Sequence, residues 1–185
     1  MMMDKITDKQ SIIITLDVDA HLFDKLQQVS NAGFSAVEIN CADHSLLSSA
    51  LNHFPRLRIG AGNIVNTQQL EDCYQAGVHF VTSPGFLPAI AQTASIYSIT
   101  YLPGIATLSE AMQAHSLGCS QLRPFPANLP FCTLLNKYLP EIRLYPAELE
   151  WDEIEHYLNL PAVAAISIIN PESKQLQALS STLFV

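Results

Sequence analysis

The sequence predicts an α/β fold, a small (β/α)8 barrel, and two observations support this prediction. Short apolar runs typical of strands alternate with amphipathic runs typical of helices along nearly the whole chain of 185 residues. Eight such apolar runs can be distinguished, each bounded by turn residues, as buried parallel strands are. Eight strands with intervening helices fit a closed barrel. The same alternation also fits an open, doubly wound sheet.

The strand candidates are short and rich in β-branched residues, as in SIIITL and AVAAISII, the first and last of them. They are expected at residues 11–16, 35–40, 57–62, 79–83, 99–103, 119–123, 142–146 and 162–169. In a barrel of this kind, function sits where the carboxyl ends of the strands meet.

The first helical run shows its buried face in the spacing of Leu22, Leu26 and Val29, and Gly33 is expected as its C-cap. A second run, over residues 66–77, is expected to begin at an N-cap, Thr67.

The third clear helix signal covers residues 107–118. Thr107 and Glu110 have the spacing of a capping box, and Gly118 is the expected stop. Gly77 is the expected stop of the second run, so the order helix, glycine, strand recurs along the chain. The length suits a single domain over residues 1–185, with residues 1–10 as a flexible N-terminal tail.

Composition excludes several classes of partner. The formal net charge is −8, Lys and Arg number nine, and no basic cluster occurs, so neither nucleic acid nor an anionic membrane is expected. No apolar run reaches the roughly 18 residues that span a bilayer. The four cysteines are irregularly spaced, which favours reduced thiols in a cytoplasmic protein over a zinc module or a disulfide scaffold. No metal or cofactor is expected.

Polar and turn residues gather at the predicted carboxyl ends of the strands. They are Asp17, Glu38 with Asn40, Asn63, Ser83–Pro84–Gly85, Pro103–Gly104, Arg123 and Tyr145.

Four segments in order carry a resemblance to a known family. They are GFSAVEIN (33–40), IGAGNIVNTQQLEDCYQAGVHFVTSPGFLPAI (59–90), YLPGIATLSEAMQAHSLG (101–118) and LRPFPA (122–127). The chain resembles the 2-keto-3-deoxy-6-phosphogluconate (KDPG) and 4-hydroxy-2-ketoglutarate (KHG) aldolases. The resemblance implies a class I aldolase-like barrel, a homotrimer, and retro-aldol cleavage of a 2-keto-3-deoxy sugar acid to pyruvate and an aldehyde.

The resemblance also implies roles for individual residues. Glu38 falls on the family's proton-shuttling glutamate. Ser83–Pro84–Gly85 and Pro103–Gly104 fall on pocket turns, and Phe125 falls on the turn after strand 6. Arg123, however, stands where the family carries the lysine that forms an imine with the keto group of the substrate.

Other departures from the family pattern affect anion binding. Asp17 and Ala42 replace two arginines, and Asn63 replaces a threonine. YPAELEW (145–151) replaces a Gly-Gly phosphate loop, and SIINP (167–171) replaces a glycine-rich turn. The remaining lysines are Lys5, Lys9, Lys25, Lys137 and Lys174, and none is expected to reach the mouth of the barrel.

Two interpretations of Arg123 remain open. Its permanent charge could clamp a carboxylate or phosphate, or it could pair internally with Asp17 or Glu38, which the two nearby acids favour. Glu38 is either a general base or a residue retained for the fold. For Asn63 a role in the turn is favoured, and a nucleophilic role for Ser83 is not expected because no histidine is predicted beside it.

Three functions therefore follow. The first is a lyase acting on a 2-keto acid. The second is a pseudoenzyme kept as a ligand-binding or assembly protein, which the residues favour. The third is enolisation of a 2-keto acid with Glu38 as base and Arg123 as clamp for the oxyanion or carboxylate.

Overall fold

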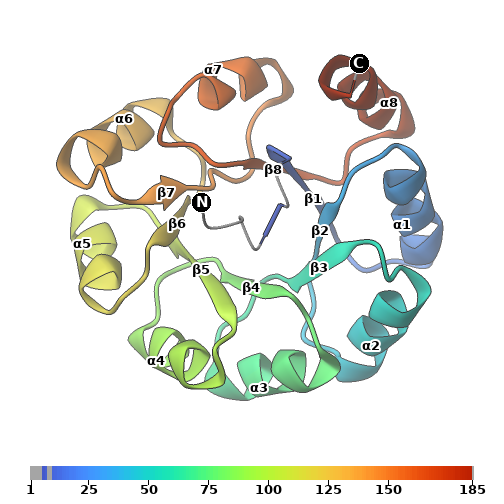
Figure 1. Ribbon diagram of the computed structural model, residues 1–185, viewed down its shortest axis with the longest axis horizontal. Coiled ribbons are helices and arrows are strands. Elements are labelled where there is room, and N and C mark those ends of the chain that lie inside the picture. The colour runs from blue at the N-terminus through green and yellow to red at the C-terminus, as the bar shows by residue number, and fades with distance from the viewer. Residues whose placement is uncertain (1–5, 8–9, 185) are drawn as a thin grey trace.

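Eight parallel strands form a ring, and the helices that connect them lie outside it (Figure 1). The computed structural model describes residues 6–7 and 10–184. The strands are β1 (Ile12–Leu16), β2 (Ala36–Ile39), β3 (Arg58–Ala61), β4 (Phe80–Ser83), β5 (Thr100–Ile105), β6 (Gln121–Pro124), β7 (Arg143–Leu144) and β8 (Ile166–Ile169).

The ring closes between β7 and β8. The hydrogen-bonded order runs from β7 through β1 to β8, and parallel bridges join Leu144 to Val163 and Ala147 to Ser167. The predicted (β/α)8 barrel is therefore confirmed, and the alternative of an open sheet is wrong.

The helices follow the strands in regular alternation. They are α1 (Leu22–Asn31), α2 (His44–His53), α3 (Thr67–Ala76), α4 (Pro88–Tyr97), α5 (Leu108–Ser116), α6 (Leu129–Tyr138), the 3₁₀ turn η1 (Trp151–Glu153) with α7 (Ile154–Leu158), and α8 (Ser173–Leu183). Among the helices of the described residues, none is both long and apolar enough to cross a bilayer.

The helix ends lie at the predicted capping residues or within one residue of them. The capping box of Thr107 and Glu110 is formed, and Gly77 caps α3 in the left-handed region. The N-cap of α3 is Asn66, whose side chain accepts a hydrogen bond from the amide of Gln69 at 2.9 Å, so the prediction of Thr67 was one residue late. Gly33, with φ +92°, follows the C-cap of α1 by one residue.

The largest difference from the predicted strand bounds is at β8, which begins at Ile166 instead of residue 162. The ends of β5, β6 and β7 differ from the prediction by one or two residues. Pro103 and Gly104 were expected at the end of a strand over residues 99–103, but β5 continues to Ile105, so both lie inside it and Gly104 pairs with Arg123 of β6. The strand β7 is only two residues long.

The barrel interior contains an apolar layer at its amino-terminal end, separate from the core between strands and helices. Its buried residues are Ile6, Ile13, Ala36, Phe80, Leu102, Tyr145 and Ala165. Tyr145, expected at the mouth, therefore lies deeper, and its hydroxyl accepts a hydrogen bond from Gln121 Nε2 at 3.0 Å.

Ile6 and Thr7 contradict the prediction of a flexible tail at their positions. Both are fully or almost fully buried. The carbonyl of Ile6 accepts from Arg58 Nε at 3.1 Å, and that of Thr7 accepts from Ser35 Oγ at 3.0 Å. Residues 1–5 and 8–9, with Lys5 and Lys9 among them, lie outside the described residues.

Candidate functional site

A polar layer lies inside the barrel above the apolar layer. Residues two positions apart on a strand share a face, so Thr15, Glu38, Thr82 and Ser167 follow Ile13, Ala36, Phe80 and Ala165 on the inner face. With Arg123 of β6, these four residues are buried polar groups. This layer is the floor of the mouth at which the carboxyl ends of the strands meet.

Arg123 and Glu38 form an ion pair across this layer. Nη1 of Arg123 lies 2.6 Å from Oε2 of Glu38 and also donates to Oγ1 of Thr82 at 2.7 Å. The hydroxyl of Thr15 donates to Oε1 of Glu38 at 3.0 Å. Only 9% of the Arg123 side chain and 2% of the Glu38 side chain are exposed. The internal pairing of Arg123 is therefore the interpretation that the geometry bears out.

The rest of the guanidinium group has a different environment. Nε of Arg123 is buried and has no hydrogen-bond partner among the described residues. The ring of Phe125 packs over the group, with its centroid 5.4 Å from Cζ. Phe125, predicted from the turn after strand 6, thus lies directly against the ion pair.

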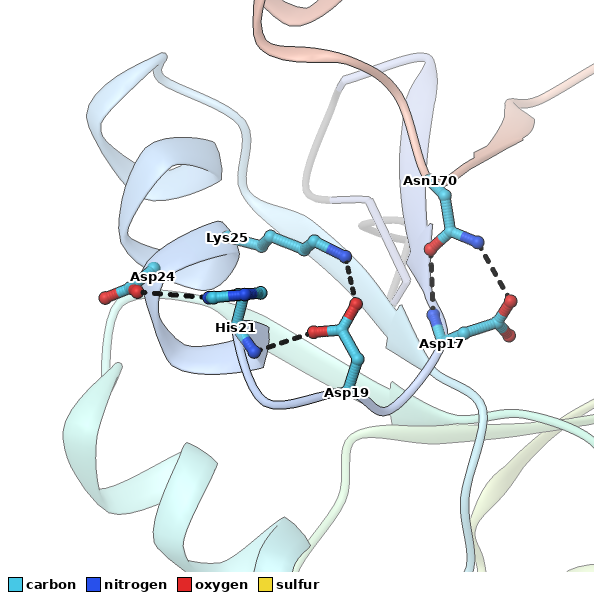
Figure 2. Close-up of polar contacts among 6 residues, drawn as sticks. All are labelled: Asp17, Asp19, His21, Asp24, Lys25 and Asn170. Carbon is cyan, nitrogen blue, oxygen red and sulfur yellow. Dashed lines mark hydrogen bonds and ion pairs between the residues drawn. The ribbon is translucent and has the colours of Figure 1, made fainter.

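Asp17 is not the partner of Arg123. Its carboxylate accepts hydrogen bonds from Nδ2 of Asn40 at 2.9 Å and from Nδ2 of Asn170 at 2.8 Å. Its amide in turn donates to Oδ1 of Asn170 at 3.0 Å, as Figure 2 shows. Asp17 therefore ties the ends of β1, β2 and β8 together at the rim.

Lys25 lies in a helix, as the sequence predicted, and its side chain reaches the loop after β1. It belongs to the beginning of α1, and its ammonium group is hydrogen-bonded to Asp19 in the loop between β1 and α1 (Figure 2). This bond from Lys25, together with the amide of His21, lowers the pKa of Asp19. Lys174 also lies in the first turn of its helix, whereas Lys137 lies in the last turn of α6.

Ser83 turns its side chain away from the mouth. Its hydroxyl donates to the carbonyl of Gly85 at 2.6 Å and lies 2.5 Å from the hydroxyl of Tyr101. Burial raises the pKa of Tyr101 to about 12, so this phenol stays protonated and can act as the donor to Ser83. Ser83 and Tyr101 thereby fix the turn that contains Pro84 and Gly85.

Gly62 and Gly104 leave no room for a side chain, because a neighbouring residue lies close to the Cα atom of each. A Cβ atom on Gly104 would lie 2.2 Å from the carbonyl oxygen of Pro84, and one on Gly62 would lie 2.3 Å from Oδ1 of Asn40. Asn63 has a left-handed backbone, φ 61°, and is exposed. The role of Asn63 in the turn, favoured by the sequence, agrees with this conformation.

The segment after β7 is acidic. Ala147 pairs with Ser167 of β8, and it is followed by Glu148 and Glu150, both exposed. Since anions are stabilised by cations and by free amide groups, this segment is unsuited to a phosphate group. Within the described part of the chain, no cluster of three or more His, Cys, Asp or Glu residues could hold a metal ion.

Three residues of the site were not identified from the sequence. Thr15 and Thr82 hold the ion pair, and Asn170 holds Asp17. For the threonines a signal existed, because each stands two residues after an inward apolar residue on its strand. For Asn170 the sequence offered only its position after the last strand.

The guanidinium group of Arg123 limits the reactions that this site can catalyse. An arginine nitrogen cannot condense with a ketone as a neutral lysine amine does, because its lone pairs are delocalised. Both oxygens of Glu38 already accept hydrogen bonds from neighbours.

A family model, described as KDPG and KHG aldolase, matches residues 4–177. A 2-dehydro-3-deoxy-phosphogluconate aldolase of Pseudomonas aeruginosa is 28% identical over 162 residues, which are 83% of this chain and 74% of that enzyme. The KHG/KDPG aldolase of Escherichia coli K12 is 37% identical over 73 residues, 40% of this chain, and the match spans only 34% of that enzyme.

Solved structures of such enzymes share the fold. A KDPG aldolase from Zymomonas mobilis superposes with a TM-score of 0.84 at 19% identity, covering 95% of this chain and 92% of the other. A Legionella pneumophila KDPG aldolase, with pyruvate captured as a covalent carbinolamine intermediate, gives 0.81 at 22% identity, covering 95% and 94%. These likenesses show the barrel itself.

Proposed function

The chain belongs to the KDPG and KHG aldolase family, and from that premise we propose that it is a diverged member that forms no imine with its ligand. In this proposal the protein is a pseudoenzyme that retains the barrel as a ligand-binding or assembly protein. The observation that carries it is the buried ion pair of Arg123 with Glu38. Arg123 stands in place of the lysine that the resemblance makes the covalent catalyst. It is also paired with the carboxylate of Glu38, on which the resemblance puts the proton shuttle.

The departures around the pair support the same proposal. Asp17 is engaged with Asn40 and Asn170 and adds a negative charge to the mouth. Glu148 and Glu150 stand in the segment where the family has its phosphate loop. A sugar acid phosphate, which carries both a carboxylate and a phosphate group, would therefore meet repulsion where the family resemblance implies cations.

The ion pair disfavours the alternative function, enolisation of a 2-keto acid without a lysine. A general base must lie within hydrogen-bond reach of a substrate proton, and Oε2 of Glu38 is directed to Arg123 instead. Cleavage by the class I mechanism is disfavoured for a further reason. Without a lysine imine, the carbanion that cleavage produces has no electron sink.

We propose two further properties on the strength of family membership. The protein assembles as a homotrimer, as the sequence resemblance implies. It resides in the cytoplasm, where the four cysteines, all free in the structure, would stay reduced.

The test of the proposed function is trapping with borohydride. The protein is incubated with pyruvate and borohydride, and its intact mass is measured beside that of an active KDPG aldolase. No adduct is expected. A stable adduct on any of the five lysines refutes the proposal, and peptide mapping then identifies the amine, with Lys25 the first position to inspect because it is bonded to Asp19 in the loop after β1.

A further inference from the structure

An apolar groove lies between α7 and α8 on the outside of the ring, where these two helices are neighbours (Figure 1). Its volume is about 220 Å³. Trp151, Ile154 and Leu158 line one wall, at the spacing of a single helix face, and Leu179 and Leu183 line the other. Ile154 and Leu179 are buried, whereas Trp151 is 38% and Leu183 is 37% exposed. The groove is therefore an apolar surface that the chain leaves partly uncovered.

The groove exists because α7 is short. This helix has five residues and α8 has eleven, which is a difference of about 9 Å at 1.5 Å per residue. The three-residue turn η1 before α7 makes up only part of the difference. The face of α8 that a longer neighbour would cover stays open at Ala178 and Thr182, which line the groove and are exposed.

The size of the groove and the closure of the barrel indicate which kind of occupant fits. A volume of about 220 Å³ is below the range of about 300–1,000 Å³ that is usual for small-molecule sites. In the described part of the chain the strands form a closed ring, so a partner peptide finds no strand edge to extend. Two neighbouring helices can instead accept a third, which inserts apolar side chains at positions i, i+3, i+4 and i+7. An amphipathic helix is therefore the occupant that fits.

The charge beside the groove selects a basic partner. Glu155 lines the groove itself. It belongs to an acidic stretch, residues 148–155, which contains no Lys or Arg and has five carboxylates, those of Glu148, Glu150, Asp152, Glu153 and Glu155. All five residues are exposed, and none of their carboxylates makes a hydrogen bond or an ion pair with another described residue. Lys174 is the only lysine or arginine of α7 and α8. Carboxylates this close repel one another, and the cations of a partner would relieve that repulsion.

We propose that the groove between α7 and α8 is a docking site for a basic amphipathic helix of a partner protein. Apolar side chains of that helix occupy the space between Trp151 and Leu183, and its lysines or arginines face the acidic stretch. The groove is outside the barrel, whereas the pair of Arg123 and Glu38 is buried inside it. The inference therefore goes beyond the proposed function and does not depend on the chemistry at Arg123.

The test uses Trp151, the only tryptophan of the chain, as the probe of the groove. The full-length protein is titrated with a synthetic helical peptide of leucine and lysine, in which the leucines stand at i, i+3, i+4 and i+7. Leucines in the groove remove Trp151 from water, so its fluorescence should move to shorter wavelength and saturate. One control peptide has the same composition with the leucines spread around the helix, and another has glutamate in place of lysine. Neither control should produce the shift.

Two variants identify the groove as the site of binding. Ala178→Phe fills the groove from an exposed position and should weaken peptide binding at least about tenfold. The same change at Ala89, an exposed alanine of α4, should leave binding unaltered. Glu155→Lys should weaken binding about fivefold or more. Glu141→Lys changes the net charge equally at an exposed position outside the acidic stretch and should alter binding less than about twofold. The urea midpoint of each variant shows whether it is folded.

Several outcomes would overturn the inference. No shift with any peptide would leave the groove without this occupant, and an equal shift with the spread-leucine peptide would reduce the effect to attraction of cations. Undiminished binding to Ala178→Phe would place the peptide elsewhere on the protein. A shift that grows with protein concentration in the absence of peptide would assign the groove to a second copy of the chain. None of these results affects the borohydride test, so the proposed function stands or falls separately.

Discussion

Arg123 of β6 and Glu38 of β2, 85 residues apart in the chain, form an ion pair across the interior of the barrel, with 2.6 Å between Nη1 and Oε2. By family resemblance, Arg123 stands in place of the lysine that forms an imine, and Glu38 is the glutamate that moves protons. The partners of the pair, Thr15 and Thr82, are also inside the barrel. The four residues together have the geometry of a structural cross-link.

Breaking the pair from one side should destabilise the protein strongly. Arg123→Met leaves the carboxylate of Glu38 buried without its cation, and we expect a loss of about 3–5 kcal/mol in the free energy of unfolding, measured with urea. The double variant Arg123→Met/Glu38→Leu should recover most of this loss. The exposed Arg56→Met is the control, with a change within about 0.5 kcal/mol. Equal losses in the single and double variants would contradict the coupling.

Restoring the amine alone should not restore the enzyme. Arg123→Lys is expected to give at most a slow adduct with pyruvate in borohydride trapping, and little or no turnover of KDPG. The reason is that Asp17, Ala42 and the acidic segment 145–151 remain in place of the family's anion-binding groups. Turnover near that of an active aldolase in this single variant would show that these departures matter little.

Gly104 should not tolerate a side chain. A Cβ atom there meets the backbone of Pro84 at 2.2 Å, and a backbone atom cannot move aside as a flexible side chain can. Gly104→Ala should cost about 3 kcal/mol in urea unfolding. Gly85→Ala is the matched control from the neighbouring turn, since a Cβ atom there meets nothing within 4 Å. Similar stabilities of the two variants would argue against this packing.

His79 should make stability depend on pH in the mildly acidic range. Its Nδ1 accepts a hydrogen bond from the amide of Ile59 at 3.0 Å. Removal of the ring from water, and secondarily the charge of Arg58, lower the pKa of His79 from its ordinary value of 6.5. The unfolded chain therefore binds the proton first. The stabilisation from neutral His79 is present above pH 6.5 and is lost as pH falls through the lowered pKa of the folded state.

The measurement for His79 is the urea midpoint of the wild type and of His79→Asn across this range. The asparagine oxygen can still accept from Ile59 but does not titrate. The wild type should lose stability relative to the variant on acidification. Parallel curves would mean that His79 does not titrate differently in the folded and unfolded states.

The homotrimer is tested by light scattering. At micromolar concentration we expect a mass three times that of the 20.3 kDa chain. Among the described residues, Ile96 and Met112 are apolar side chains with 79% and 56% of their surface exposed in the single chain. A monomer mass would count against the trimer.

The barrel could be predicted from sequence because its signal is repeated eight times, and an error at one strand does not alter the pattern. The partner of Arg123 could not be predicted in the same way. Glu38 is paired with Thr15 of the neighbouring strand, whereas Asp17 stands two residues beyond Thr15, about 6.6 Å further along the strand. Which acid is level with Arg123 depends on strand register, which the sequence does not display.

The burial of Ile6 could not be predicted either, for a different reason. A single apolar residue among polar neighbours has no periodicity, so the segment read as a tail. Its burial follows only from the shape of the closed barrel, which leaves a space at its amino-terminal end.

The position of Ile6 has a consequence for the order of events during synthesis. Its neighbours in the apolar layer include Tyr145, directly after β7, and Ala165, directly before β8. The ribosome makes Ile6 before the strands of the barrel, yet its binding place is complete only when the last strand has closed the ring. Contacts of such long sequence separation form slowly. A segment that precedes every strand of the barrel in the chain is therefore among the last to be fixed in the native structure.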